Sequence, residues 1–201
     1  AGSSGSAAIG SGESSTGYTT INIHDTNPEK GVKSAFAYGG AGIGSGRYAK
    51  GKTYVTISNA SVSTLETPAA STNTSGAGIG TGAAIGSGSE GDVLSRPTGD
   101  PNTFKTIIRI SDSNVTASSG PCAAIGSGSY STNATEIHIN GGKIEASNYS
   151  GSAIGSGDSA KGKTGIYITG SNVTATADIG TGIGSGTSSS GETTIDISGG
   201  T

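Results

Sequence analysis

The chain has 201 residues and a formal net charge of −3, and it combines 38 glycines and one cysteine with a hydrophobic content of only 30%. This composition argues against a compact globular core, and a single cysteine excludes an internal disulfide. Because the sequence has no Lys/Arg run and no stretch of ~20 apolar residues, we expect neither a nucleic-acid partner nor membrane insertion.

The dominant pattern is the tetrapeptide Ile-Gly-Ser-Gly, which recurs along the whole chain and is followed each time by a short alternating segment. Its six copies begin at Ile9, Ile43, Ile85, Ile125, Ile154 and Ile183. From Ile125 onward the copies are 29 residues apart. A fixed period of this size is typical of a solenoid.

One uninterrupted repeat, residues 152–181, contains three apolar pieces. They are Ala153 to Gly157, Ile166 to Thr169 and Val173 to Ala175. Each alternates with a period of two, as expected of a strand with one buried face, and turn-forming residues separate them. One repeat therefore predicts one coil of three short strands.

In chain order, the glycine motifs lead to second strands that start at Ile21, Val55, Ile108, Ile137, Ile166 and Ile195. The distance from motif to strand is 12 residues in five copies and 23 in the third, from Ile85 to Ile108. An insertion of about Glu90 to Pro101 explains the excess, although Ile79-Gly80-Thr81-Gly82 offers a competing register 29 residues before Ile108. Loop insertions are expected near residues 26–36, 66–76 and 89–103.

These patterns predict a single all-β domain over residues 1–201, a parallel β-solenoid (β-helix) of about six coils with three short strands each. Because crossover connections between parallel strands are generally right-handed, we expect a right-handed solenoid. Two inward columns are expected, one of second-strand isoleucines and one of third-strand residues: Ile23, Ile57, Ile110, Ile139, Ile168 and Ile197, and Val62, Val115, Ile144 and Val173. The final Ser198-Gly199-Gly200-Thr201 matches the middle of an earlier repeat, which indicates a segment of a longer array.

The glycine motif allows two interpretations. If its Ile faces inward, strict alternation places the motif serines in an internal hydroxyl ladder and the glycines on a flat exterior open to close approach. Alternatively, glycine is present because the motif forms a tight corner.

The tandem repeats contain, in order, Ala-Gly-Ile-Gly-Ser-Gly or Ala-Ala-Ile-Gly-Ser-Gly, then Thr-x-Ile-x-Ile, then Gly-Gly or Ser-Asn with Val-Thr-Ala. This pattern resembles the Gly-rich parallel β-helix repeats of large microbial cell-surface proteins. The resemblance covers nearly the whole chain. It implies an extracellular or cell-surface location and a structural, adhesive or carbohydrate-binding role. Because the sequence has no paired-carboxylate motif, Ser-His-Asp set or phosphate loop, we expect a structural or adhesive element rather than an enzyme.

One outward row of the second strand carries varied chemistry. It comprises Asn22, Thr56, Arg109, His138, Tyr167 and Asp196. The last four are 29 residues apart and are expected on successive coils, where they offer donors, acceptors and an aromatic face for a glycan or cell-surface ligand. An ordinary exposed cross-strand row would look the same.

Two other functions stay open. A polysaccharide-active enzyme would use the third-copy insertion, with Glu90, Asp92, Arg96 and Asp100 near Lys105 and Arg109. An ice-binding face would use the row Ser58, Ser111, Asn140, Thr169 and Ser198 or the Gly/Ala face. No cofactor motif or metal-ligand set is evident, and self-association through the solenoid ends or the Gly-rich face is a further expectation.

Overall fold

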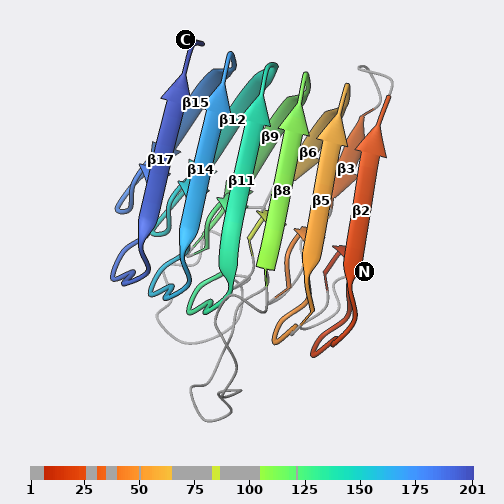
Figure 1. Ribbon diagram of the computed structural model, residues 1–201, viewed down its shortest axis with the longest axis vertical. Helices are drawn as coiled ribbons and strands as arrows, with labels where there is room; N and C mark the ends of the chain where they lie inside the picture. Colours follow the sequence, from red (N-terminus) through yellow and green to blue (C-terminus); the bar gives the residue numbers. More distant parts are fainter. Residues whose placement is uncertain are drawn as a thin grey trace.

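The computed structural model describes residues 7–25, 31–34, 40–49, 51–64, 83–86, 105–120 and 122–201. All regular elements within these ranges are β-strands, and they form three stacked parallel sheets (Figure 1). The predicted parallel β-solenoid of three-stranded coils is therefore confirmed. Over the same ranges, no helix is long and apolar enough to span a membrane.

The motif sheet consists of the Ile-Gly pairs of the tetrapeptide. Its strands are β1 (Ile9–Gly10), β4 (Ile43–Gly44), β7 (Ile85–Gly86), β10 (Ile125–Gly126), β13 (Ile154–Gly155) and β16 (Ile183–Gly184), in that spatial order.

The second sheet holds the longest strands and carries the candidate site. Its strands are β2 (Thr19–His24), β5 (Thr53–Ser58), β8 (Lys105–Ser111), β11 (Ala134–Asn140), β14 (Thr164–Thr169) and β17 (Thr193–Ser198). The third sheet consists of β3 (Val32–Ser34), β6 (Ser61–Thr64), β9 (Asn114–Ser119), β12 (Lys143–Asn148) and β15 (Asn172–Ala177).

The solenoid is right-handed. In Figure 1 the strands of the second sheet run upward in front, the chain crosses over the top to the third sheet behind, and successive coils advance from β2 on the right to β17 on the left. This is the hand that parallel crossovers favour.

The core consists of side-chain columns that run along the rod. Consecutive strands pair with like residues opposite one another, as in Ile139 opposite Ile110 on one side and Ile168 on the other. Both predicted columns are present, and Val32 extends the third-sheet column, because it pairs with Val62. The middle coils are the best buried: Ile137, Ile139 and Ile154 are at most 1% exposed. Because each isoleucine so buried contributes roughly 1.5–3 kcal/mol, the columns offset much of the entropy lost by a Gly-rich chain.

The motif glycines form tight corners, as the second interpretation predicts. Gly126 has a φ of 146°, and a Cβ placed on it would lie 1.8 Å from the carbonyl oxygen of Gly155 in the next coil. Gly44, Gly86 and Gly155 have the same geometry. The expectation of a flat, bare glycine exterior is wrong, because these glycines are buried against the neighbouring coil rather than displayed.

The motif serines do form an internal ladder. The backbone N–H of Gly157 donates to the hydroxyl of Ser127 in the preceding coil at 3.1 Å, and Gly186 donates likewise to Ser156 at 3.2 Å. Each serine thus satisfies a backbone donor of the following coil, which links the coils through the interior.

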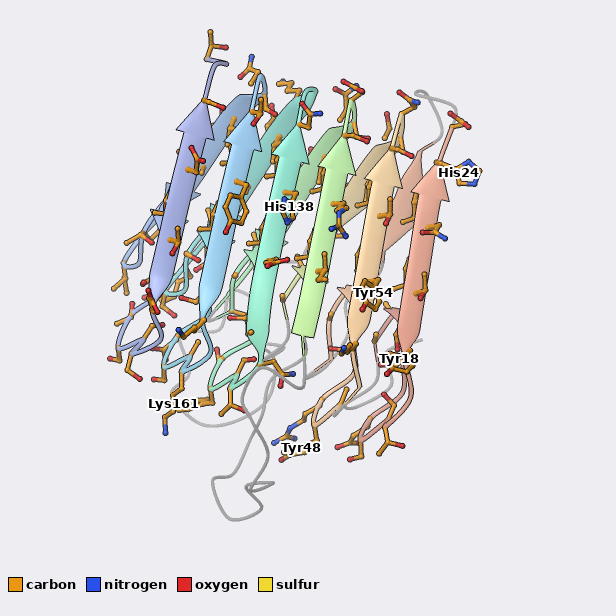
Figure 2. All side chains as sticks on the ribbon, viewed as in Figure 1. Tyr18, His24, Tyr48, Tyr54, His138 and Lys161 are labelled. Atoms are coloured by element: carbon orange, nitrogen blue, oxygen red, sulfur yellow. The ribbon has the colours of Figure 1, made fainter. Side chains whose placement is uncertain are left out.

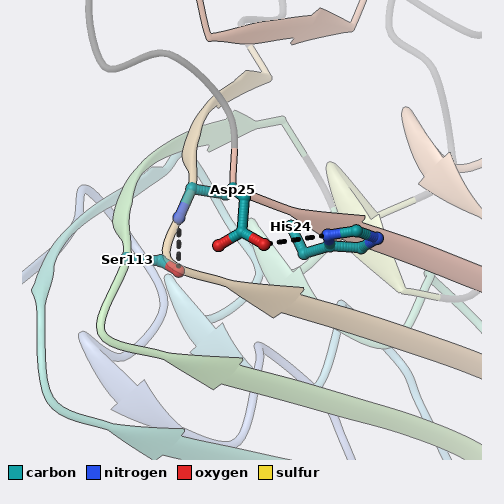
Figure 3. Close-up of polar contacts among 4 residues, drawn as sticks. His24, Asp25 and Ser113 are labelled. Carbon is teal, nitrogen blue, oxygen red and sulfur yellow. Dashed lines mark hydrogen bonds and ion pairs between the residues drawn. The ribbon is translucent and has the colours of Figure 1, made fainter.

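The corner after the second sheet is formed by residues with a left-handed backbone conformation and is stabilised by hydrogen bonds of a serine. Asp25, Asn59 and Asp112 adopt φ values near 50°, a conformation for which Asn and Asp are enriched. At this corner the Ser113 hydroxyl donates to the Ser111 carbonyl oxygen. The same hydroxyl accepts from the Ala60 N–H of the previous coil, the contact drawn at Ser113 in Figure 3.

The insertions lie partly within the described chain. In the expected loop near 26–36, Val32–Ser34 instead form strand β3. The expected loops near 66–76 and 89–103 lie outside the described residues. Of the two registers for the third copy, the structure adopts Ile85, because β7 pairs with both β4 and β10.

Candidate functional site

The outer face of the second sheet presents three parallel rows of side chains. The central row is the predicted one, since strand pairing places its residues opposite one another in the order Asn22, Thr56, Arg109, His138, Tyr167 and Asp196. Figure 2 shows His138 midway along β11 on this face and Tyr54 on β5. The structure thus brings Arg109, His138, Tyr167 and Asp196 onto four successive coils.

The closest contact within this row joins the two aromatic rings. The rings of His138 and Tyr167 are stacked, with centroids 4.9 Å apart and planes inclined by 17°. Tyr167 also leans over Gly165, because a Cβ placed on that glycine would lie 3.0 Å from the ring carbon Cε2. The phenol ring is therefore held in place on two sides, although 36% of the residue remains exposed.

Charged groups adjoin the aromatic pair. The Nε2 of His138 lies 3.6 Å from Oε2 of Glu136, two residues earlier on the same strand. At the corner that precedes β14 and β17, the Lys163 ammonium contacts the Glu192 carboxylate at 2.9 Å. This contact raises the pKa of Lys163 and lowers the pKa of Glu192, through the hydrogen bond first and charge attraction second.

Glu136, Lys163 and Glu192 line a hollow on the outer face with a volume of about 450 Å³. Tyr167 and Gly165 form part of its wall, together with residues of three neighbouring coils: Ala134, Thr135, Glu136, Lys163, Thr164, Glu192 and Thr194. The hollow is open to solvent, and its walls combine an aromatic ring with hydroxyl and charged groups.

Sequence reasoning missed most of this hollow. Glu136, Gly165 and Thr194 occupy a second outward row, two residues before the predicted one. Lys163 and Glu192 are 29 residues apart. The 29-residue period could therefore have revealed both sets of residues. The open space above Gly165 could not be predicted in this way, because it depends on where the Tyr167 side chain lies.

Residues of the two alternative functions are placed as follows. The predicted enzyme residues Glu90, Asp92, Arg96 and Asp100 lie outside the described residues. The row proposed for ice binding is in register from Ser58 to Ser198, and within it the Thr169 and Ser198 hydroxyls are 3.3 Å apart.

The two histidines lie far apart, on β2 and β11. His24 contacts the Asp25 carboxylate at 3.3 Å, at an exposed corner (Figures 2 and 3). Within the described ranges, no three His, Cys, Asp or Glu side chains are grouped closely enough to hold a metal ion.

Fold and surface together define this chain as a parallel β-solenoid with an aromatic and charged hollow on one sheet. Comparison with protein families, with curated proteins and with solved structures gives no match for it.

Proposed function

We propose that the chain is a structural and adhesive module of an extracellular or cell-surface protein, and that it binds carbohydrate on the outer face of the second sheet. The observation that carries this proposal is the exposed Tyr167 ring, which is backed by His138 and adjoins the hollow. An aromatic ring with an apolar face and a polar tip suits a sugar, which has both C–H faces and hydroxyl groups. The resemblance to cell-surface β-helix repeats supports the location.

The arrangement supports binding rather than catalysis. The carboxylates of the hollow each contact a basic side chain, Glu136 with His138 and Glu192 with Lys163. Arg109 and Asp196 extend the row on either side of the aromatic pair, so that a chain of several sugar units has donors and acceptors along several coils.

A glycan array probed with the wild-type chain and with Tyr167→Ala tests the proposal. Tyr149→Ala is the matched control, because Tyr149 is an exposed tyrosine that lies outside the hollow. We expect selective retention of a glycan class by the wild type and the control, and its loss in Tyr167→Ala. Equal retention by all three proteins would refute the site, and no retention by the wild type would refute carbohydrate binding.

A further inference from the structure

We infer that Gly165 is a positioning residue of the carbohydrate site: the absence of a side chain there lets the ring of Tyr167 lie over its own strand, in the direction in which it meets the ligand. This inference rests on the proposed carbohydrate binding and adds the residue that determines the direction of the aromatic ring. It follows from the atoms that surround Gly165 and from the residues that the other coils carry at the same place.

The first step is that the backbone does not require glycine at this position. Gly165 is the second residue of β14 and does not have the positive φ of the motif glycines. The other coils carry a side chain at the equivalent place: Thr20, Tyr54, Ile107, Glu136 and Thr194. Because glycine within a strand lowers stability and has no side chain to pack, a glycine that the backbone does not need often marks a close approach by another group.

The second step identifies that group. A Cβ placed on Gly165 would have three atoms of Tyr167 as its nearest neighbours, Cε2 at 3.0 Å, the hydroxyl oxygen at 3.2 Å and Cζ at 3.4 Å. At Gly126, in contrast, the nearest atom is the carbonyl oxygen of Gly155 in the next coil. Gly126 therefore leaves room for backbone, whereas Gly165 leaves room for the tip of an aromatic ring.

The third step concerns the direction of the ring. The side-chain conformation that stacks Tyr167 on His138 of the preceding coil also brings the tip of the ring over Gly165. A side chain at position 165 would occupy the space of the tip, so the ring would have to adopt another rotamer. That rotation would remove the stack with His138 and change the wall of the hollow, which Tyr167 and Gly165 line together. Gly165 thus acts on the ligand through Tyr167.

The same substitution at two positions tests this inference. Gly165→Thr introduces the residue that β17 carries at the equivalent place, and Gly17→Thr is the matched control, because no atom lies within 4 Å of a Cβ added to Gly17. Concentration series on the glycan array give apparent dissociation constants for both variants and for the wild type. For Gly165→Thr we expect about tenfold weaker binding of the glycan class that the wild type retains, as for the loss of one aromatic contact. Gly17→Thr should keep the wild-type affinity.

Urea unfolding of the same proteins distinguishes a positioning role from a structural one. The midpoint of Gly165→Thr should be equal to or above that of the wild type, because threonine is favoured in strands and the backbone at position 165 accepts a side chain. Gly165→Ala, which adds only a Cβ, serves as a second variant. A glycine that the backbone requires would instead give a lower midpoint in both.

A further readout reports on the ring without any ligand. In the wild type, the ring current of Tyr167 should shift the Hα NMR signals of Gly165, and Tyr167→Ala should abolish this shift. The coupling between His138 and Tyr167 should also disappear when their double-mutant cycle is measured in the Gly165→Thr background. A glycine that serves only the backbone would show no ring-current shift and would leave the coupling unchanged in that background.

The outcomes separate this inference from the proposed function. Wild-type affinity in Gly165→Thr, or Hα signals of Gly165 that do not respond to Tyr167→Ala, would overturn the positioning role and leave the glycan site intact. A lower unfolding midpoint in both Gly165→Thr and Gly165→Ala would overturn it as well. If the wild type retains no glycan, the proposed function fails, and the Hα signals and the coupling still decide whether Gly165 positions Tyr167.

Discussion

The imidazole ring of His138 and the phenol ring of Tyr167 lie stacked on neighbouring coils, with centroids 4.9 Å apart. The spacing matches the ~4.8 Å between paired strands, because the two residues are directly opposite each other in β11 and β14. The repeat itself therefore creates the stack, by placing two aromatic residues one period apart on the same outward row.

The stack should be measurable as a coupling between the two residues. A double-mutant cycle of His138→Ala, Tyr167→Ala and the double variant, measured by urea unfolding, should give a coupling free energy of about 0.5–1 kcal/mol. Strictly additive effects of the two substitutions would show that the rings do not interact in solution.

The motif glycines should be intolerant of a side chain. Gly126→Ala must place a Cβ against the Gly155 carbonyl oxygen at a φ of 146°, so we expect a loss of about 3 kcal/mol or more in the free energy of unfolding. Gly17→Ala is the control, because no atom lies within 4 Å of its added Cβ, and it should change stability by no more than about 0.5 kcal/mol. Similar losses in both variants would contradict the corner geometry.

The loss in free energy of unfolding caused by a core substitution should depend on the position of the residue along the solenoid. Ile139→Ala empties a fully enclosed site in the middle of the isoleucine column and should cost about 2–5 kcal/mol. Ile197→Ala, in the same column on the half-exposed last coil, should cost about 1 kcal/mol or less. Equal costs in chemical denaturation would mean that the last coil is covered in solution, for example by a second copy.

The Lys163–Glu192 contact predicts a specific pH dependence. Because Lys163 lowers the pKa of Glu192, the contribution of this carboxylate to stability is present above its unfolded pKa and is lost as the pH falls through the lower folded pKa. For Lys163, whose pKa is raised, the contribution is lost only as the pH rises through its folded pKa. Both side chains are largely exposed, so the effect on stability should be small and weakened by salt.

Carbon-detected NMR titration of the Glu192 side chain checks this relationship. In Lys163→Gln the pKa of Glu192 should rise toward the ordinary value of a glutamate. An unchanged pKa in that variant would show that the ion pair does not form in solution.

Much of the fold follows from the sequence, because the 29-residue period and the alternation together place each inward isoleucine. Ile139, for example, is assigned to the core by its neighbours at Ile110 and Ile168, and pairing in the structure confirms it. The orientation of the glycine motif does not follow in this way. Alternation assumes extended backbone, whereas Gly126 and its equivalents Gly44, Gly86 and Gly155 turn to positive φ and are buried between coils.

The candidate site was predictable only in part. The row from Arg109 to Asp196 follows from spacing alone, since strand pairing preserves it. The hollow depends on the side-chain direction of Tyr167 and on Lys163 reaching Glu192 across a corner, and a period in the sequence does not report these. The sequence also left two registers for the third coil, with the glycine motif starting at Ile79 or at Ile85. The structure adopts Ile85, because β7 pairs with β4 and β10.

The most direct test of glycan binding at Tyr167 is amide chemical-shift mapping of the isotope-labelled chain during titration with the oligosaccharide that the array retains. Binding as proposed predicts saturable shifts concentrated on β11, β14 and β17, at Glu136, His138, Gly165, Tyr167 and Thr194. Shifts confined to the third sheet or to the corner of His24, or no shifts at saturating ligand, would contradict it.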